Sequence, residues 1–347
     1  MKTFSSYLIL FSIHSFATTQ RPTRAPYFSP RNRIFNIGVQ GAGLQKGQPL
    51  AGVENGPSFI RGSGFINALR QQGHNVLDYG DIDFGFASPE PAPANRTSTE
   101  VVNAAEVSNA KFMISAQTAK IVREGRFPVT LGGDHSLSIG TIHGISEIYP
   151  DFAVLWIDAH SDINTPATTP SGNLHGMPLS LVVRELRNQV QSLAEFSWIT
   201  PRLFSSNLAY IGLRYSNNGE RAIRQRLGIS DWNMRDIDQL GIVEVARRAI
   251  RRLTLGKRDR PIYISFDIDS LDDLEIGEAT GTPVPGGISL SQAMTLIDQL
   301  QARSNIIGME LTEVNPALGD VRGHRHLAFA TRSIITCVFG ACTKGLN

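Results

Sequence analysis

Three short polar clusters, each placed directly after an apolar run, constrain the fold of this 347-residue chain more than any other feature. The clusters are Gly132-Gly133-Asp134-His135-Ser136, Asp158-Ala159-His160-Ser161-Asp162 and Asp267-Ile268-Asp269. The apolar runs before them are typical of buried strands. Ligand sites in open α/β sheets form beyond the carboxyl ends of the strands, so we expect all three clusters to meet at one rim.

Strand-like and helix-like segments alternate along the chain. Buried strands are predicted at residues 35–39, 129–131, 152–157, 208–213, 262–266 and 306–311. Helices are predicted at 98–123, 241–254 and 289–303, the last beginning at Ser289 or Ser291 as N-cap. This alternation indicates an α/β fold with a mostly parallel sheet. The loop at 88–93 is too short to be a domain linker, so residues 34–347 are predicted to form a single domain.

Composition excludes several classes of partner and site. With 33 basic and 31 acidic residues, the net charge of +2 gives no electrostatic reason to expect nucleic acid or an anionic membrane as the main partner. Beyond the N-terminus no stretch is long and apolar enough to span a bilayer. The only two cysteines, Cys337 and Cys342, exclude both a disulfide framework and a cysteine-built zinc site.

Residues 1–33 read as a leader outside the fold. Lys2, the apolar run 7–11 and a possible cleavage site after Ala17 are typical of a secretory signal. Several arginines and no acidic residue before Glu54 also fit a mitochondrial presequence. The early apolar run favours secretion, while mitochondrial import and a cytosolic location stay open. If the chain is secreted, Asn95-Arg96-Thr97 is a possible glycosylation acceptor.

The three clusters hold residue types that bind metal. Side chains at alternate positions of an extended segment point the same way, which aligns the acidic and histidine positions within each cluster. Hard divalent cations favour carboxylate oxygen, and Mn²⁺ also accepts imidazole. Six ligands are too many for one zinc ion with an open position but suit two metals about 3.5–4 Å apart. The predicted ligands are His135, Asp158, His160, Asp162, Asp267 and Asp269.

With its further motifs, the chain from about residue 37 to 345 resembles the arginase branch of the ureohydrolases. These motifs are Lys46-Gly47-Gln48-Pro49, Gly52-Val53-Glu54, Asn164-Thr165-Pro166, Ser171-Gly172-Asn173-Leu174-His175-Gly176, Tyr210-Ile211-Gly212-Leu213-Arg214, Ala279-Thr280-Gly281-Thr282-Pro283 and Glu313-Val314-Asn315-Pro316. The resemblance implies a three-layer α/β/α fold with two Mn²⁺ per subunit. It also implies hydrolysis of L-arginine to L-ornithine and urea by a homo-oligomer, a trimer or a hexamer.

The resemblance also implies roles for individual residues. Asp162 would take up or steer the proton of the attacking water, and His175 would deliver a proton to the leaving amine. Glu313 would pair with the substrate guanidinium. The remaining positions are expected to line the substrate site: Asn164, Ser171 and Asn173 at the α-carboxylate, Asn217 and Glu220 at the α-amino group, and Thr282 on the wall.

Three departures from the family pattern qualify this interpretation. Asn217 stands where arginases usually carry an acidic residue, which predicts weaker arginine binding by about 1–2 kcal/mol. The segment 272–275 is one residue longer than usual, and the chain ends at Asn347 without the tail that helps some relatives form trimers. Two alternatives follow: a related enzyme acting on another, agmatine-like guanidino compound, or a catalytically weak arginine- or metal-binding homologue. The intact set of six ligands argues against the second.

Overall fold

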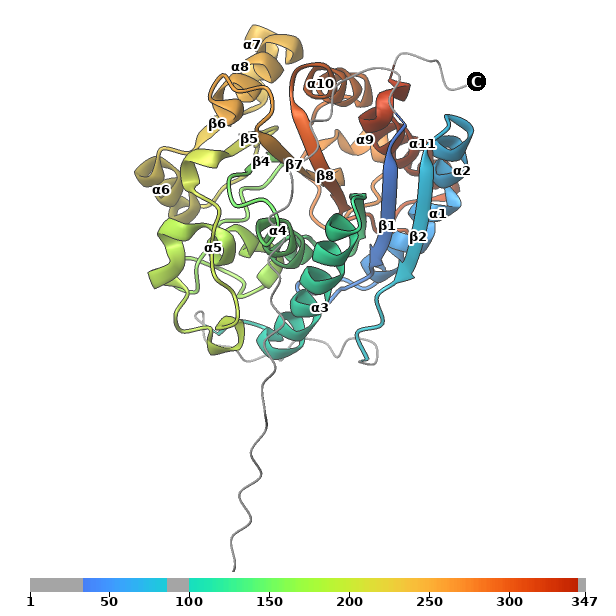
Figure 1. Ribbon diagram of the computed structural model, residues 1–347. Helices are drawn as coiled ribbons and strands as arrows, with labels where there is room; N and C mark the ends of the chain where they lie inside the picture. Colours follow the sequence, from blue (N-terminus) through green and yellow to red (C-terminus); the bar gives the residue numbers. More distant parts are fainter. Residues whose placement is uncertain (1–33, 86–99, 343–347) are drawn as a thin grey trace, which may run out of the picture.

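The computed structural model describes residues 34–85 and 100–342, and it contains one eight-stranded sheet (Figure 1). The predicted leader, the loop at 88–93 and the Asn95 acceptor lie outside the described residues. The strand order is β2-β1-β3-β8-β7-β4-β5-β6, and all neighbours pair in parallel. The strands are β1 (Asn36–Ala42), β2 (Asn75–Asp81), β3 (Phe127–Gly132), β4 (Ala153–Ile157), β5 (Leu208–Ile211), β6 (Ser230–Trp232), β7 (Pro261–Asp267) and β8 (Asn305–Thr312).

All six predicted strands are confirmed, and two edge strands were missed. β2 is partly exposed and β6 has only three residues, so neither carries the continuous apolar run of a strand buried on both faces. β5 ends at Ile211, two residues earlier than predicted, because Gly212 adopts a φ of +95° that a strand does not accommodate.

Helices cover both faces of the sheet. They are α1 (Gly56–Gly62), α2 (Phe65–Gln71), α3 (Ala104–Arg123), α4 (Ser138–Ser146), α5 (Pro178–Val182), α6 (Asn218–Leu227), α7 (Met234–Leu240), α8 (Ile242–Thr254), α9 (Asp273–Ile276), α10 (Leu290–Arg303) and α11 (Val321–Thr336). Short helical turns include η2 (His135–Leu137), η3 (Leu174–Gly176) and η7 (Ile268–Ser270). Within the described part of the chain no helix is long and apolar enough to cross a bilayer.

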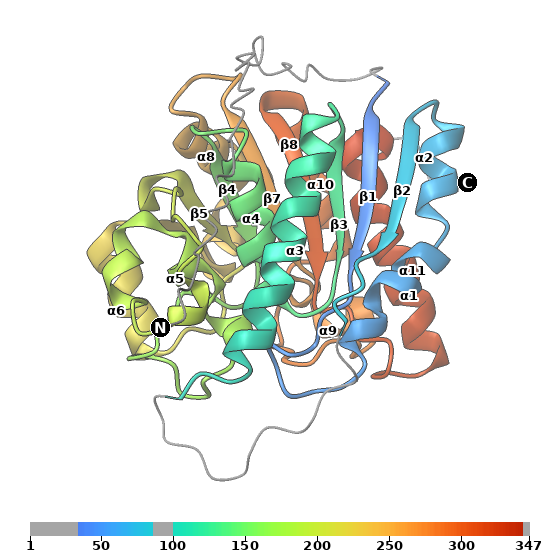
Figure 2. The same cartoon turned by 60° about the horizontal axis from the view of Figure 1, so that its bottom comes forward.

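The side-chain alternation of the strands explains the layers. Leu155 and Ile157 of β4 point to the core shared with α2, α8, α10 and α11, whereas Val154 and Trp156 point to the core shared with α3, α4 and α5. Figure 2 shows α3 and α4 in front of the sheet and α10 and α11 behind it. The predicted three-layer α/β/α fold with a parallel sheet is therefore confirmed.

The predicted helices are found with small shifts at their ends. α3 begins at Ala104 rather than at residue 98, and α8 spans Ile242–Thr254. α10 has Ser289 as its N-cap, because the Ser289 hydroxyl accepts from the amide of Gln292 and the Gln292 side chain accepts from the amide of Ser289.

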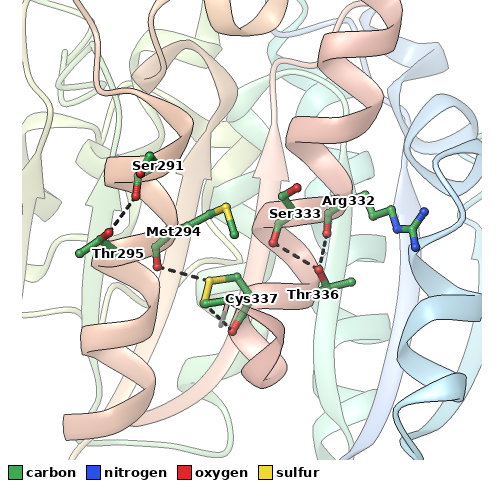
Figure 3. The surroundings of a disulfide bond; sticks show 8 residues. Ser291, Met294, Thr295, Arg332, Ser333, Thr336 and Cys337 are labelled. Carbon is green, nitrogen blue, oxygen red and sulfur yellow. Dashed lines mark hydrogen bonds between the residues drawn. A yellow bond between two sulfur atoms is a disulfide. The ribbon is translucent and has the colours of Figure 1, made fainter. Parts of the chain in front are cut away.

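One local disulfide joins Cys337 and Cys342 just after α11, only five residues apart. A disulfide across so short a loop does not join distant parts of the fold, so it agrees with the predicted absence of a disulfide framework. The Cys337 sulfur lies 3.3 Å from the carbonyl oxygen of Met294 in α10 (Figure 3). The disulfide therefore lies where the end of α11 packs against α10.

We expect Gly140→Ala in α4 to destabilise the fold, because α3 and α4 pack too closely there for a methyl group. A Cβ at Gly140 would lie 2.6 Å from the carbonyl oxygen of Lys111, and overpacking of this kind typically costs about 1–3 kcal/mol. Gly62→Ala in α1 is the matched control, since a Cβ there meets nothing within 4 Å. That variant should gain about 0.5–1 kcal/mol, and equal effects in urea unfolding would contradict the packing argument.

Candidate functional site

The three polar clusters lie at the carboxyl ends of adjacent central strands. β3, β7 and β4 end in the first, third and second cluster, and β8, which leads to Glu313, lies between β3 and β7. The expectation that these clusters share one rim of the sheet is therefore confirmed by the strand order. The strand order explains the site. Asp158 and Asp267 are more than a hundred positions apart in sequence, but they lie close together because β4 and β7 are adjacent strands.

The six predicted ligands form two groups that share Asp158. His135 Nδ1 lies 3.1 Å from Asp158 Oδ2, 3.2 Å from Asp162 Oδ2 and 2.8 Å from Asp267 Oδ2. His160 Nδ1 lies 2.9 Å from Asp269 Oδ2 and 3.5 Å from Asp158 Oδ1. The two oxygens of Asp158 thus face different groups, which is the arrangement of a bridging carboxylate.

The donor atoms of these groups fit a bound cation. His135 Nδ1 and Asp269 Oδ2 are buried and have no hydrogen-bond partner, although each lies beside groups of the cluster. Buried polar atoms are rarely left without a partner, and an ion would supply one. His135 with Asp158 and Asp162, and Asp158 with His160 and Asp269, each place their ligand atoms within 4.8 Å of one another.

Electrostatics in the cluster also favour cations. Burial together with the negative charge of Asp158 raises the pKa of Asp162 to about 7. Burial and the neighbouring carboxylates Asp269 and Asp158 raise the pKa of Asp267. Burial lowers the pKa of His160, but the facing carboxylates outweigh it and raise that pKa above its usual value. Burial also raises the pKa of Asp269, whereas at Asp158 burial is outweighed by the two neighbouring imidazoles, which lower the pKa of that carboxyl. Three of the four carboxylates are therefore costly to ionise without a cation, and divalent cations would relieve that cost.

A second layer of side chains, which the sequence analysis missed, orients His135. The Ser265 hydroxyl donates to Glu310 at 2.6 Å, so it can only accept from His135 Nε2, which lies 2.8 Å away. This leaves Nδ1 directed at the cluster. Trp156 stacks on the His135 ring with centroids 4.1 Å apart and donates to Asp158 at 2.8 Å. Trp156 and Ser265 stand two positions before Asp158 and Asp267, and that spacing could have identified them.

Glu313 and His175 form a pair beside the first group. Glu313 Oε1 accepts from the backbone amide of His135 at 2.8 Å and lies 3.3 Å from His175 Nδ1. Burial lowers the pKa of His175, but the bond and charge of Glu313 outweigh it and raise that pKa. Glu313 and Asp162 also adopt left-handed backbone conformations, with φ of 59° and 45°. Such strain in residues other than glycine concentrates at functional sites.

A cavity of about 160 Å³ opens over these groups. Its wall includes Asp162, His175 and Glu313 together with five of the predicted substrate contacts: Asn164, Ser171, Asn217, Glu220 and Thr282. Asn173 does not line it, although its backbone amide donates to the Ser171 hydroxyl at 3.2 Å. The wall also holds residues that the sequence analysis did not select, namely Thr169, Pro170, Gly176 and Tyr215.

Asn217 and Glu220 have a structural role in addition to their place in the cavity wall. The Asn217 side chain accepts from the Glu220 amide, and the Glu220 carboxylate accepts from the Asn217 amide, each at 3.0 Å, which caps the start of α6. Asn217 Nδ2 also donates to Asn164 Oδ1 at 2.9 Å. These polar groups are therefore mostly engaged within the protein.

The longer segment after β7 folds into the short helix α9. Asp272 caps this helix and also accepts from the amides of Gly286 and Gly287. Arg214 donates to the carbonyl oxygens of Asp269 at 2.6 Å and Ser270 at 3.0 Å. Arg214 and Asp272 thus fix the backbone of residues 269–272.

Comparisons with known proteins agree with this geometry. The arginase family model matches residues 35–339. The hepatic arginase of Aquarana catesbeiana is 42% identical over 314 residues, covering 90% of this chain and 95% of that protein, and the mitochondrial arginase-2 of Rattus norvegicus is 43% identical over 313 residues, covering 90% and 87%. The solved arginase of Bacillus caldovelox superposes with a TM-score of 0.79 at 32% identity, covering 88% of this chain and 99% of that one.

Fold, cavity and comparisons together define a hydrolase of the ureohydrolase class. Within that class, the chain belongs to the arginase family.

A divalent cation bound by these groups should raise the melting temperature far more at pH 8 than at pH 5. Asp162, Asp267 and both cluster imidazoles have folded-state pKa values raised above their unfolded values. They therefore stabilise the metal-free fold at low pH, and this contribution is lost as pH rises through the folded-state values. Metal binds the deprotonated groups, so it compensates at high pH and competes with protons at low pH. Thermal unfolding with and without Mn²⁺ at both pH values checks this, and equal shifts would refute it.

Proposed function

We propose that the protein binds two Mn²⁺ ions and hydrolyses L-arginine to L-ornithine and urea. Membership in the arginase family supports the reaction. The observation that carries the two-metal assignment is the pair of ligand groups sharing Asp158, with His135 in one group and His160 in the other. Two imidazoles among four carboxylates are a donor set that suits Mn²⁺ better than Ca²⁺ or Mg²⁺, which favour oxygen alone.

The metals would be held by His135, Asp158, Asp162 and Asp267 in the first group and by Asp158, His160 and Asp269 in the second. When bound, such a pair supplies Lewis-acid activation of water near neutral pH. Activation of the water is needed because a guanidinium carbon is resonance-stabilised and a poor electrophile. The remaining tasks of binding, orientation and proton transfer belong to the protein.

His175 and Glu313 are suited to the two tasks on the substrate side. Glu313 lies in the cavity wall and is almost fully buried, so a guanidinium placed beside it would form a charge-assisted hydrogen bond in a low-dielectric setting. Glu313 outweighs burial and raises the pKa of His175 above its usual value, which favours the protonated ring, and lies 3.3 Å from the Nδ1 atom of that ring. We assign His175 as the donor of a proton to the leaving amine, and Asp162 as the acceptor of the proton from the attacking water.

We expect the residues at the rim of the cavity to select substrates by the group at the end opposite the guanidinium. Asn164, Ser171 and Thr282 offer neutral polar groups to an α-carboxylate, and the Tyr215 ring lies 5.7 Å from the ring of His160, edge to face. The Glu220 carboxylate already accepts backbone hydrogen bonds, so it is not left entirely to an α-ammonium. This favours, as a second candidate, a guanidino substrate that keeps the carboxylate but carries no ammonium at this position, such as a guanidino carboxylate.

A urea assay on the purified, Mn²⁺-loaded protein with L-arginine and with agmatine tests the proposal. We expect turnover of L-arginine and little or none of agmatine, since only arginine has the carboxylate that the polar rim would bind. Asp269→Ala should abolish turnover and lose at least one metal per chain by elemental analysis, because its carboxylate contributes to the second group. Turnover of agmatine alone would refute L-arginine as the substrate. Full activity of Asp269→Ala would refute the ligand assignment.

Asn217→Asp should lower the KM for L-arginine about tenfold, because an ionised acceptor holds an ammonium more strongly than a neutral one. Aspartate is also a good N-cap, so α6 should stay intact. The control substrate is 5-guanidinopentanoate, which is arginine without its α-amino group and whose KM should not fall. A KM for arginine that does not change would remove the α-ammonium from this position.

We also propose a single catalytic domain spanning residues 34–347 that assembles as a homo-oligomer, a trimer or a hexamer. Family membership is the support for the assembly, and the one continuous sheet is the support for the domain. Light scattering would report the assembly as a multiple of about 38 kDa, the mass of one 37.9 kDa chain.

A further inference from the structure

A row of polar side chains crosses the sheet directly behind the candidate metal site. Across β1, β3, β8 and β7 the paired residues are Gln40, Thr130, Glu310 and Ser265, and the row continues to Trp156 of β4. All five are fully buried. Residues paired in register point to the same face, and Trp156 packs in the core shared with α3, α4 and α5. The row therefore lies between the sheet and α3 and α4, where apolar side chains would be the ordinary choice.

Glu310 is the charged centre of this row. Its carboxylate accepts hydrogen bonds from the hydroxyls of Ser138 and Thr141 in α4, from Tyr263 at 3.0 Å and from Ser265 at 2.6 Å. Four donors around one buried carboxylate leave it acting only as an acceptor. Through Ser265 this acceptor determines which way the serine hydroxyl points, and therefore which nitrogen of His135 faces the cluster.

Lys111, on the buried side of α3, carries a positive charge that acts on Glu310. Its side chain is fully buried and its Nζ has no hydrogen-bond partner. Burial lowers the pKa of Lys111 to about 8, and the charges of Asp134, Glu310 and Glu313 oppose that shift. A buried ammonium without a partner is costly, so its presence needs a compensating role. The carboxylates around it are the groups that its charge can balance.

We propose that Lys111 is a positioning residue for the candidate metal ligand His135, acting through Glu310 and Ser265. Its ammonium balances the charge of Glu310, which stays an acceptor for the Ser265 hydroxyl. Ser265 in turn accepts from His135 Nε2, and His135 Nδ1 is presented to the cluster. The inference rests on the proposed metal site, but the link between Lys111 and Glu310 does not require a metal.

Two possible roles of the Lys111 charge predict opposite changes in Mn²⁺ affinity when that charge is removed. If Lys111 acted only as a positive charge near the metals, its loss would strengthen Mn²⁺ binding, because a repulsion is removed. If it acts through Glu310, its loss leaves a buried carboxylate uncompensated, the acceptor chain rearranges, and Mn²⁺ binding weakens. Loss of a partner behind a metal ligand typically weakens metal affinity 10- to 100-fold.

The test is a double-mutant cycle with Lys111→Met, Glu310→Gln and the double variant. Mn²⁺ affinity is measured by calorimetry, and unfolding of the metal-free protein is measured in parallel. We expect Lys111→Met alone to weaken Mn²⁺ binding at least tenfold and to add less than a threefold loss in the Glu310→Gln background. The metal-free unfolding cycle should show the same coupling. Lys120→Met, an exposed lysine on the same helix, is the matched control and should leave Mn²⁺ binding unchanged.

Three outcomes would overturn the proposal: unchanged or tighter Mn²⁺ binding in Lys111→Met, full additivity with Glu310→Gln, or an undiminished effect of Lys111→Met in a Ser265→Ala background. Should Lys111→Met not fold, Lys111→Gln replaces it, since glutamine removes the charge and keeps a polar group. Failure of the unmutated protein to bind Mn²⁺ would instead overturn the proposed function. The metal-free unfolding cycle distinguishes that case, because it reports the link between Lys111 and Glu310 directly.

Discussion

Four carboxylates buried against two imidazoles are the constraint on which the rest of the molecule depends. The carboxylates repel one another and all six groups lose hydration, so they stay together only where the surrounding structure holds them. The four central strands supply that rigidity, since each is covered on both faces and paired on both edges. The supporting contacts of Trp156 and Ser265 then limit how far Asp158 and His135 can move apart. A site built on mobile loops would hold four mutually repelling carboxylates in place less well.

The features of this arrangement that could be predicted are those that leave a local pattern in the sequence. The runs ending at Leu131, Ile157 and Phe266 are mostly apolar, and a charged residue follows each of them within three positions. Both features follow from a strand buried on two faces that ends at a ligand site. The edge strands could not be predicted in this way, because one exposed face or a length of three residues removes the pattern.

The polar row behind the site is harder to recognise, for a different physical reason. Ser265 and Glu310 are single polar residues inside apolar strands. The strand register that places them side by side cannot be read from the sequence. Lys111 is less conspicuous still, because a lysine in an amphipathic helix is ordinarily read as part of its exposed face. Only the packing of α3 over β3 and β8 turns these isolated residues into one connected group.

The capping of α6 has a consequence for how this enzyme could change its substrate. Asn217 belongs both to the cavity wall and to the N-cap of α6, where its side chain and that of Glu220 bind each other's backbone amides. Helix N-caps strongly prefer asparagine, aspartate, serine, threonine and glycine. The requirement for a good N-cap therefore limits which side chains can replace Asn217, whatever the substrate. Larger changes in preference would have to arise at uncoupled wall positions such as Tyr215.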